Sequence, residues 1–203
     1  VVMCAVVTMA ATGDKDGRFD TVTARHIRVT NDAGKHVVGL DANDGGDGLV
    51  RTRSAKGKEL VELGATVDGH GLVRTRSAKG KELVKLGATV DGHGMVTTYQ
   101  PNGKMLVALG ANVGSKGTVT TYQSNGKELV TLNATVEAQG MVMTYQPNGK
   151  ELVKLTASPE GGLVYVYNKT GEDIVHIRAD EYGNGLVGAW NRKGKGRTLQ
   201  PGP

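Results

Sequence analysis

The chain has 203 residues, of which 31 are glycine, one is phenylalanine and one is tryptophan, and 38% are apolar. This composition indicates many short turns around a thin core of valine, leucine and alanine, and it argues against an enzyme with a thick interior. The net charge of +5 permits a polyanionic partner but is equally typical of an ordinary soluble surface.

Residues 1–20 are interpreted as an apolar leader or an assembly strand. The run from Val1 to Ala11 is too short to span a bilayer, so no transmembrane span is expected, but it suffices for the apolar region of a secretory signal. If the run is retained, it is a candidate donor strand for the open edge of another subunit. The donor residues would be Val1, Val2, Ala5, Val6 and Val7.

A Gly-Lys pair recurs every 23 residues, with one step of 22, which makes residues 21–197 an array of about eight similar units. Residues 198–203 break this rhythm and form a C-terminal tail. A unit of this size cannot bury its own apolar face and has to stack on its neighbours or on other chains. The repeated pairs begin at Gly34, Gly57, Gly80, Gly103, Gly126, Gly149 and Gly194.

The segment from Gly48 to His70 shows the pattern of one unit, which reads strand, tight turn, strand and looser turn. We predict a two-residue type I′ turn at Lys56-Gly57, because later units have Asn-Gly at this place. Such a turn pairs Thr52 with Val61, and Val50 with Leu63.

These pairs give each unit one apolar face, and from Met95 onward the opposite face gains Met and Tyr residues as well. Strands that are apolar on both faces usually lie between two layers or at a subunit contact. We therefore predict an all-β rod of tandem strand-turn-strand repeats, of the trimeric β-prism or β-helix type. A single-chain β-solenoid is the alternative. Sixteen stacked strands would span about 75 Å, and eight solenoid coils about 38 Å.

The pattern Gly-x-Val-x-x-Tyr-x-x-Asn-Gly-Lys-x-Leu-Val-x-Leu resembles the glycine-punctuated β-repeats of uncharacterised secreted bacterial proteins. More loosely, it resembles the trimeric β-fibre shafts of phage and viral spikes. The resemblance extends from about Ile27 to Arg197 and implies an extended fibre that is secreted or on the bacterial cell surface. MORN and curli-type repeats have a similar length, but their Tyr-x-Gly-x-Trp core and Gln-x-Gly-x-Gly-Asn ladder are missing here.

Two groups of side chains are candidates for an assembly or ligand face. An aromatic residue recurs at one position of the unit and would form a column that stacks sugar rings or, more simply, packs between repeats or subunits. A basic patch on the same face would suit carboxylate, sulfate or phosphate, or would keep an exposed sheet soluble. The column consists of Tyr99, Tyr122, Tyr145, Tyr167 and Trp190, and the patch of Arg51, Arg53, Arg74 and Arg76.

A weak calcium candidate lies in the glycine-rich segment with Asp41, Asn43, Asp44 and Asp47. It fails the EF-hand pattern at Gly45, where an oxygen ligand is required, and an ordinary Asp-Gly turn is the alternative. No nucleophile with a base, carboxylate pair, phosphate loop or zinc set has the required spacing. We therefore expect no enzyme activity, no cofactor and no metal centre.

These observations favour a structural subunit of an extracellular fibre, filament or surface appendage, which associates with itself as a homotrimer or a polymer. The alternative is an adhesin-like binding module that recognises an acidic polysaccharide or another polyanion through the basic patch. No specific nucleic-acid partner is expected.

Overall fold

One antiparallel β-sheet contains every strand of the protein that the structure describes. The computed structural model describes residues 22–200, except 113, 136 and 138, and these residues form sixteen strands and no helix. The strands are β1 (Ile27–Thr30), β2 (His36–Ala42), β3 (Gly48–Arg53), β4 (Glu59–Ala65), β5 (Gly71–Arg76), β6 (Glu82–Ala88), β7 (Gly94–Tyr99), β8 (Met105–Ala111), β9 (Gly117–Tyr122), β10 (Glu128–Ala134), β11 (Gly140–Tyr145), β12 (Glu151–Ser158), β13 (Gly161–Tyr167), β14 (Asp173–Ala179), β15 (Gly185–Trp190) and β16 (Gly196–Leu199).

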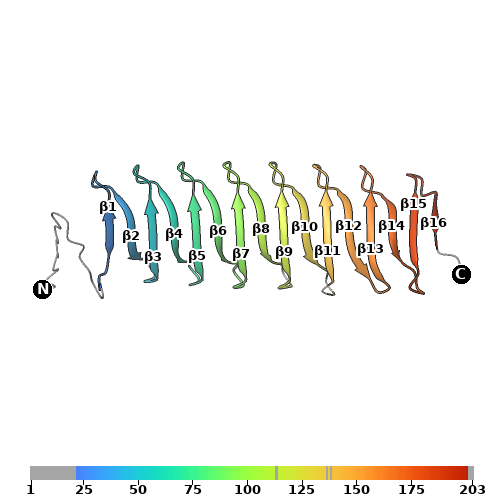
Figure 1. The fold of residues 1–203 in the computed structure, drawn as a ribbon, viewed down its shortest axis with the longest axis horizontal. Coiled ribbons are helices and arrows are strands. Elements are labelled where there is room, and N and C mark those ends of the chain that lie inside the picture. The colour runs from blue at the N-terminus through green and yellow to red at the C-terminus, as the bar shows by residue number, and fades with distance from the viewer. Residues whose placement is uncertain (1–21, 113, 136, 138, 201–203) are drawn as a thin grey trace, which may run out of the picture.

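Each strand pairs with the next one along the chain, so the sheet is a meander that stays open between β1 and β16. Figure 1 shows the strands side by side in a single layer, with β1 and β16 at opposite ends. The predicted all-β array of strand-turn-strand units is confirmed. The pairing is antiparallel, whereas the solenoid alternative would place equivalent strands of successive repeats side by side in parallel. At about 4.8 Å per strand, the sheet is about 72 Å long.

The predicted register of the hairpins is confirmed, and a β-bulge accompanies it. Thr52 lies opposite Val61, but the next pair toward the turn is Arg53 with Glu59, so Leu60 is an extra residue in β4. A register shift occurs at the same place in the hairpins that begin with β1, β5, β7, β9, β11 and β13. In each of these hairpins, the turn shifts the pairing of the two strands by one residue, and the bulge then restores the predicted register.

The predicted type I′ turn at Lys56-Gly57 is wrong. The Ser54 carbonyl accepts a hydrogen bond from the Gly57 N–H at 2.8 Å, and the Ser54 N–H donates to the Lys58 carbonyl at 2.8 Å. Gly57 has φ +78°, while Lys56 does not have the positive φ that a type I′ turn requires. The loop therefore has three residues, a type I turn followed by a left-handed glycine.

The connecting turns between units are equally tight, although the sequence indicated looser ones. Thr66 donates to the His70 carbonyl at 2.7 Å, and Gly69 donates to the Thr66 carbonyl at 2.9 Å. This is the same three-residue loop as in the Gly-Lys turns. The link between β12 and β13 is shorter, because Ser158 pairs directly with Gly161. This shorter link accounts for the single 22-residue step in the period.

One face of the sheet, here called the apolar face, carries two rows that run across the strands without interruption. Val50 lies opposite Leu63, as predicted, and Leu63 lies opposite Val73 of the next unit. We call this row of large side chains the ridge and the adjacent row of small residues the trough. The ridge comprises Leu40, Val50, Leu63, Val73, Leu86, Val96, Leu109, Val119, Leu132, Val142, Leu155, Val164, Ile177 and Val187. The trough comprises Ala42, Gly48, Ala65, Gly71, Ala88, Gly94, Ala111, Gly117, Ala134, Gly140, Ala157, Gly162, Ala179 and Gly185.

The opposite face, here called the mixed face, carries the arginines, glutamates and tyrosines of the strands and only part of their threonines, because Thr52 and its equivalents lie on the apolar face. All the side chains that the structure buries lie on this face, because its long side chains fold over their neighbours. The buried side chains are those of Leu49, Leu72, Thr97, Thr120, Thr131, Leu163 and Leu186, and Gly188 is buried as well.

Candidate functional site: the two faces of the sheet

The ridge is half-exposed along the length of the sheet. Its leucines from β2 to β12 and Ile177 in β14 have between 41% and 46% of their surface accessible. The exposed fraction of these side chains hardly varies, because every repeat places an equivalent side chain at the same position along its strand. Monomeric soluble proteins rarely expose contiguous apolar patches of more than a few hundred Å². The apolar face is therefore the strongest candidate for an interaction site.

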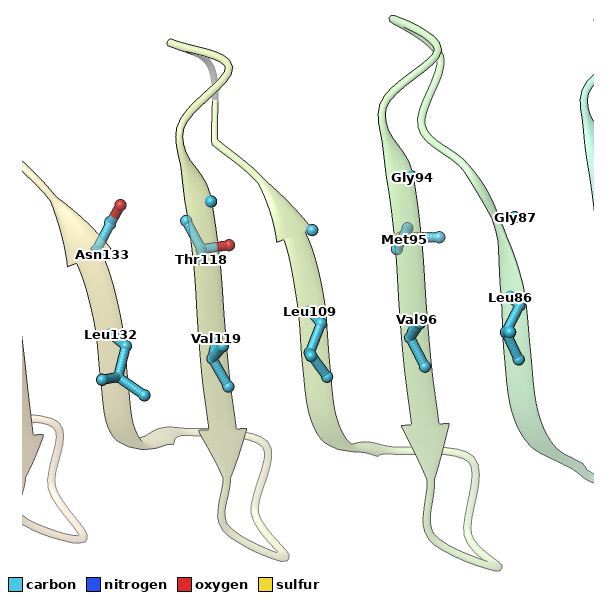
Figure 2. Close-up of a pocket in the computed structure, with 12 residues that line it drawn as sticks. Leu86, Gly87, Gly94, Met95, Val96, Leu109, Thr118, Val119, Leu132 and Asn133 are labelled. Atoms are coloured by element: carbon cyan, nitrogen blue, oxygen red, sulfur yellow. The ribbon is translucent and has the colours of Figure 1, made fainter. Parts of the chain in front are cut away.

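The trough makes this face hollow beside the ridge. Figure 2 shows Leu86, Val96, Leu109, Val119 and Leu132 in one row across neighbouring strands, with Gly94 at one side of the row. A hollow of about 580 Å³ extends over these residues and Gly117. The hollow exists because trough residues have either a single methyl group or no side chain. A shorter hollow at the equivalent place involves Leu155, Gly162 and Ile177.

The mixed face covers its own apolar side chains. Leu49 extends over Gly64 in the next strand, where a Cβ atom would come within 2.8 Å of Leu49 Cδ1. Leu72 lies over Gly87 in the same way, at 3.4 Å. Both leucines are less than a tenth exposed. Leu49 and Leu72 of the mixed face are thus buried within the chain, whereas the leucines of the ridge are not.

The predicted basic patch lies at one end of the mixed face and is largely neutralised by glutamates. Arg74 Nε lies 2.7 Å from Glu82 Oε2, and Arg76 Nη2 lies 3.1 Å from Glu62 Oε2. Arg74 also lies 3.6 Å from Glu62. Arg76 pairs in addition with Glu59, which is 3.4 Å from Arg51 Nε. These contacts form an ion-pair network in which three of the four predicted arginines take part.

The predicted aromatic residues each lie at the end of an odd-numbered strand, from β7 to β15, on the mixed face. Between them lie residues of the even strands, as Met105 does opposite Tyr99 and Glu128 opposite Tyr122. One even-numbered strand thus separates successive members of the column. Burial and the nearby negative charge of Glu151 raise the pKa of Tyr167 to about 12.

Ring contacts occur toward the C-terminal end of the sheet, and they include two residues that the sequence did not single out. The rings of Tyr165 and Tyr167 have centroids 6.0 Å apart, and His176 lies 4.6 Å from both Tyr165 and Trp190. His176 also pairs with Asp173. Tyr165 and His176 lie directly opposite each other in β13 and β14. Only the observed register of these two strands reveals this contact.

Side chains at the Gly-Lys turns join successive hairpins. Gln100 donates to the Gln123 carbonyl at 3.4 Å, and Gln123 donates to the Gln146 carbonyl at 3.3 Å. Lys127 Nζ donates to the Asn148 carbonyl at 2.7 Å in the same region. These bonds span about one period of the sequence, and they link each turn to the turn of the next unit.

The calcium candidate forms an ordinary hydrogen-bonded turn. Asn43 Oδ1 accepts bonds from the N–H groups of Gly45 and Asp47, at 3.0 and 2.8 Å. Asp41 accepts from the Ala42 N–H and pairs with His26 at 2.6 Å, and these contacts lower its pKa, the backbone bond most. Among the described residues, no group of three or more His, Cys, Asp and Glu side chains is placed to hold a metal ion.

The predicted donor strand, with Val1, Val2, Ala5, Val6 and Val7, lies outside the described residues. Within the part of the chain that the structure describes, no helix has the length and apolar character needed to cross a membrane. No protein-family model matches the chain, and no curated protein matches it.

Proposed function

We propose that this protein is a structural subunit that associates with itself and builds a fibre, filament or surface appendage. The single observation that carries the proposal is the half-exposed ridge, which continues from β2 to β15 in a sheet of one layer. A sheet normally buries one face against another layer. Consecutive strands pair edge to edge, and within the residues that the structure describes no second layer lies on the apolar face. In this proposal, other molecules provide that layer.

The chemistry of the surface favours assembly over catalysis or binding of a charged ligand. The ridge and the trough consist of Leu, Ile, Val, Ala and Gly, and they offer apolar area but no reactive group. On the mixed face, the ion pairs of Arg51, Arg74 and Arg76 offset the positive charge that would attract a polyanion. We therefore place the adhesin-like role second. An extracellular location is part of the proposal and rests on the resemblance to secreted β-repeat proteins and fibre shafts.

Light scattering after size-exclusion chromatography tests the proposal, together with negative-stain images of the same fraction. We expect a mass well above the 21.2 kDa of one chain, and elongated particles. Association should persist in 1 M NaCl, because apolar contacts are not screened by salt. A compact monomer at micromolar concentration would overturn the proposal. Retention on a heparin column that is lost when Arg51, Arg53, Arg74 and Arg76 are replaced by Ala would instead support the adhesin-like role.

A further inference from the structure

We infer that the layer missing from the apolar face is a second copy of this chain, which packs face to face with the ridge of each copy in the trough of the other. This inference rests on the proposed function and specifies the partner and the geometry. It differs from the trimeric prism expected from the sequence, because two sheets suffice to cover the face.

The shape of the apolar face supports this arrangement. Ridge and trough are adjacent rows, about 6.6 to 6.8 Å apart along the strands, since residues of one face alternate with residues of the other. A two-fold axis parallel to the long dimension of the sheet reverses the order of the rows. If the partner sheet is then shifted along the strands by the distance between two rows, the ridge of each copy lies over the trough of the other. The two ridge-to-trough contacts therefore form together. In Figure 2, Gly94 of the trough lies to one side of the ridge row formed by Leu86, Val96 and Leu109.

The spacing along the sheet points to a second copy rather than to an unrelated partner. The trough presents an Ala and a Gly in every pair of strands, and the ridge presents a Leu or Ile and a Val with the same repeat. Two strands correspond to about 9.6 Å, so a partner must repeat its side chains at this interval over the length of the face. Another copy of the same array meets this requirement, because its side chains repeat at the same interval in every unit.

The area is sufficient for a stable complex. Ridge and trough extend from β2 to β15 over about 62 Å, and the two rows with their side chains cover a width of about 13 Å, which gives about 800 Å² per copy. A specific interface of standard size buries about 800 Å² per partner. The mixed face would remain outside, where its Arg, Glu and Lys side chains stay in contact with water.

The experiment fills the trough without disturbing the single sheet. A Cβ atom at Gly94 or Gly117 would meet nothing within 4 Å, and neither glycine has a positive φ, so leucine fits at both positions of the isolated chain. In the proposed pair, however, Gly94→Leu and Gly117→Leu collide with the partner's ridge. Gly39→Leu is the matched control, because Gly39 also has free space but lies opposite Arg51 on the mixed face.

We expect the wild-type chain to have a mass of about 42 kDa, twice 21.2 kDa, or a multiple of this pair. Each trough substitution should raise the dissociation constant at least about tenfold, while Gly39→Leu leaves it unchanged. Circular dichroism verifies that the variants keep the β-sheet. Leu86→Ala with Leu109→Ala tests the ridge from the other side and should also weaken the pair.

The outcomes separate the inference from the proposed function. A monomeric wild-type chain would overturn both. A wild-type chain that associates as a trimer of about 64 kDa, or one whose association is unaffected by the trough and ridge substitutions, would overturn the face-to-face pair and leave the structural role standing.

Discussion

The six-membered ring of Trp190 lies directly over the backbone of Gly188. A Cβ atom built on Gly188 would come within 2.1 Å of the indole atom Cη2. The two residues are two positions apart in β15 and thus belong to the same face of the strand, next to His176. The absence of a side chain at Gly188 gives the indole its place on the sheet, and in return the indole covers a glycine that would otherwise weaken the strand.

Replacing Gly188 by alanine should therefore displace the indole. We expect Gly188→Ala to lower the free energy of unfolding by about 1 to 3 kcal/mol, as overpacking does at covered sites. Because the chain has one tryptophan, its fluorescence emission reports the displacement directly, as a shift to longer wavelength. Gly185→Ala is the control in the same strand, since a Cβ atom there meets nothing within 4 Å. An unchanged emission spectrum in Gly188→Ala would contradict this description of the contact.

Deleting the bulge residue Leu60 should be tolerated, whereas deleting Leu63 should not. Without Leu60, the pairs Arg53 with Glu59 and Thr52 with Val61 follow each other regularly, as the pairs of β15 and β16 do. Without Leu63, the strand has to give up either the bulge or the alternation of its side chains between the two faces. Residues of β4 then move from one face of the sheet to the other. Thermal unfolding followed by circular dichroism should show a cooperative transition close to the wild type for the first variant and a much lower midpoint for the second. Similar midpoints for both deletions would show that the bulge does not set the register.

The ion-pair network should contribute measurably to stability through Glu62. The side chain of Glu62 is 15% exposed and contacts Arg74 and Arg76. Glu62→Gln should lower the free energy of unfolding by about 1 to 2 kcal/mol, because two guanidinium groups lose a shared charged partner. The loss should shrink in 1 M NaCl. Lys85→Gln, at the equivalent position of the next unit, is the control; it removes a like charge opposite Arg74 and should not destabilise the fold. If Lys85→Gln lowers the free energy of unfolding as much as Glu62→Gln does, the ion pairs of Glu62 are not the source of the stabilisation.

Alkaline pH should weaken the fold through Tyr167. Its pKa is raised from 10.0 to about 12, chiefly by burial and then by the negative charge of Glu151, so the folded chain holds the phenolic proton more tightly than the unfolded chain does. This contribution is fully present below pH about 10 and is lost as the pH rises from about 10 to about 12. In urea unfolding at pH 9 and pH 11.5, Tyr167→Phe should lose less stability between the two pH values than the wild type. Tyr182→Phe, at a tyrosine that is 81% exposed, is the control. Equal losses in Tyr167→Phe and the wild type would exclude this role.

The period and the alternation of side chains were sufficient to predict the all-β class, the strand-turn-strand unit and the pairing of Thr52 with Val61. They were not sufficient to predict the turn. A two-residue loop and a three-residue loop followed by a bulge give the same register farther along the strands, and Lys56-Gly57 is compatible with both. The choice depends on the φ of the residue before the glycine, which the sequence does not specify.

The candidate site was predicted only in part. The apolar stripe could be read from the alternation of residues. The pairing of arginines with glutamates across four strands could not, because it depends on side chains that reach diagonally from one hairpin to the next, as Arg76 does to Glu62. The contact of Trp190 with Gly188 also depends on a rotamer rather than on spacing.

The hairpins from β1 to β14 all return to the same register after their turns, and this determines how the sheet can change in length. Val50, Leu63 and Val73 follow one another straight across the sheet, so the stagger between the first and the last strand does not accumulate. A ribbon whose strands all stay at one level can gain or lose whole units without disturbing those that remain. Its length, at about 9.6 Å for every unit, is then set by the number of repeats in the gene alone.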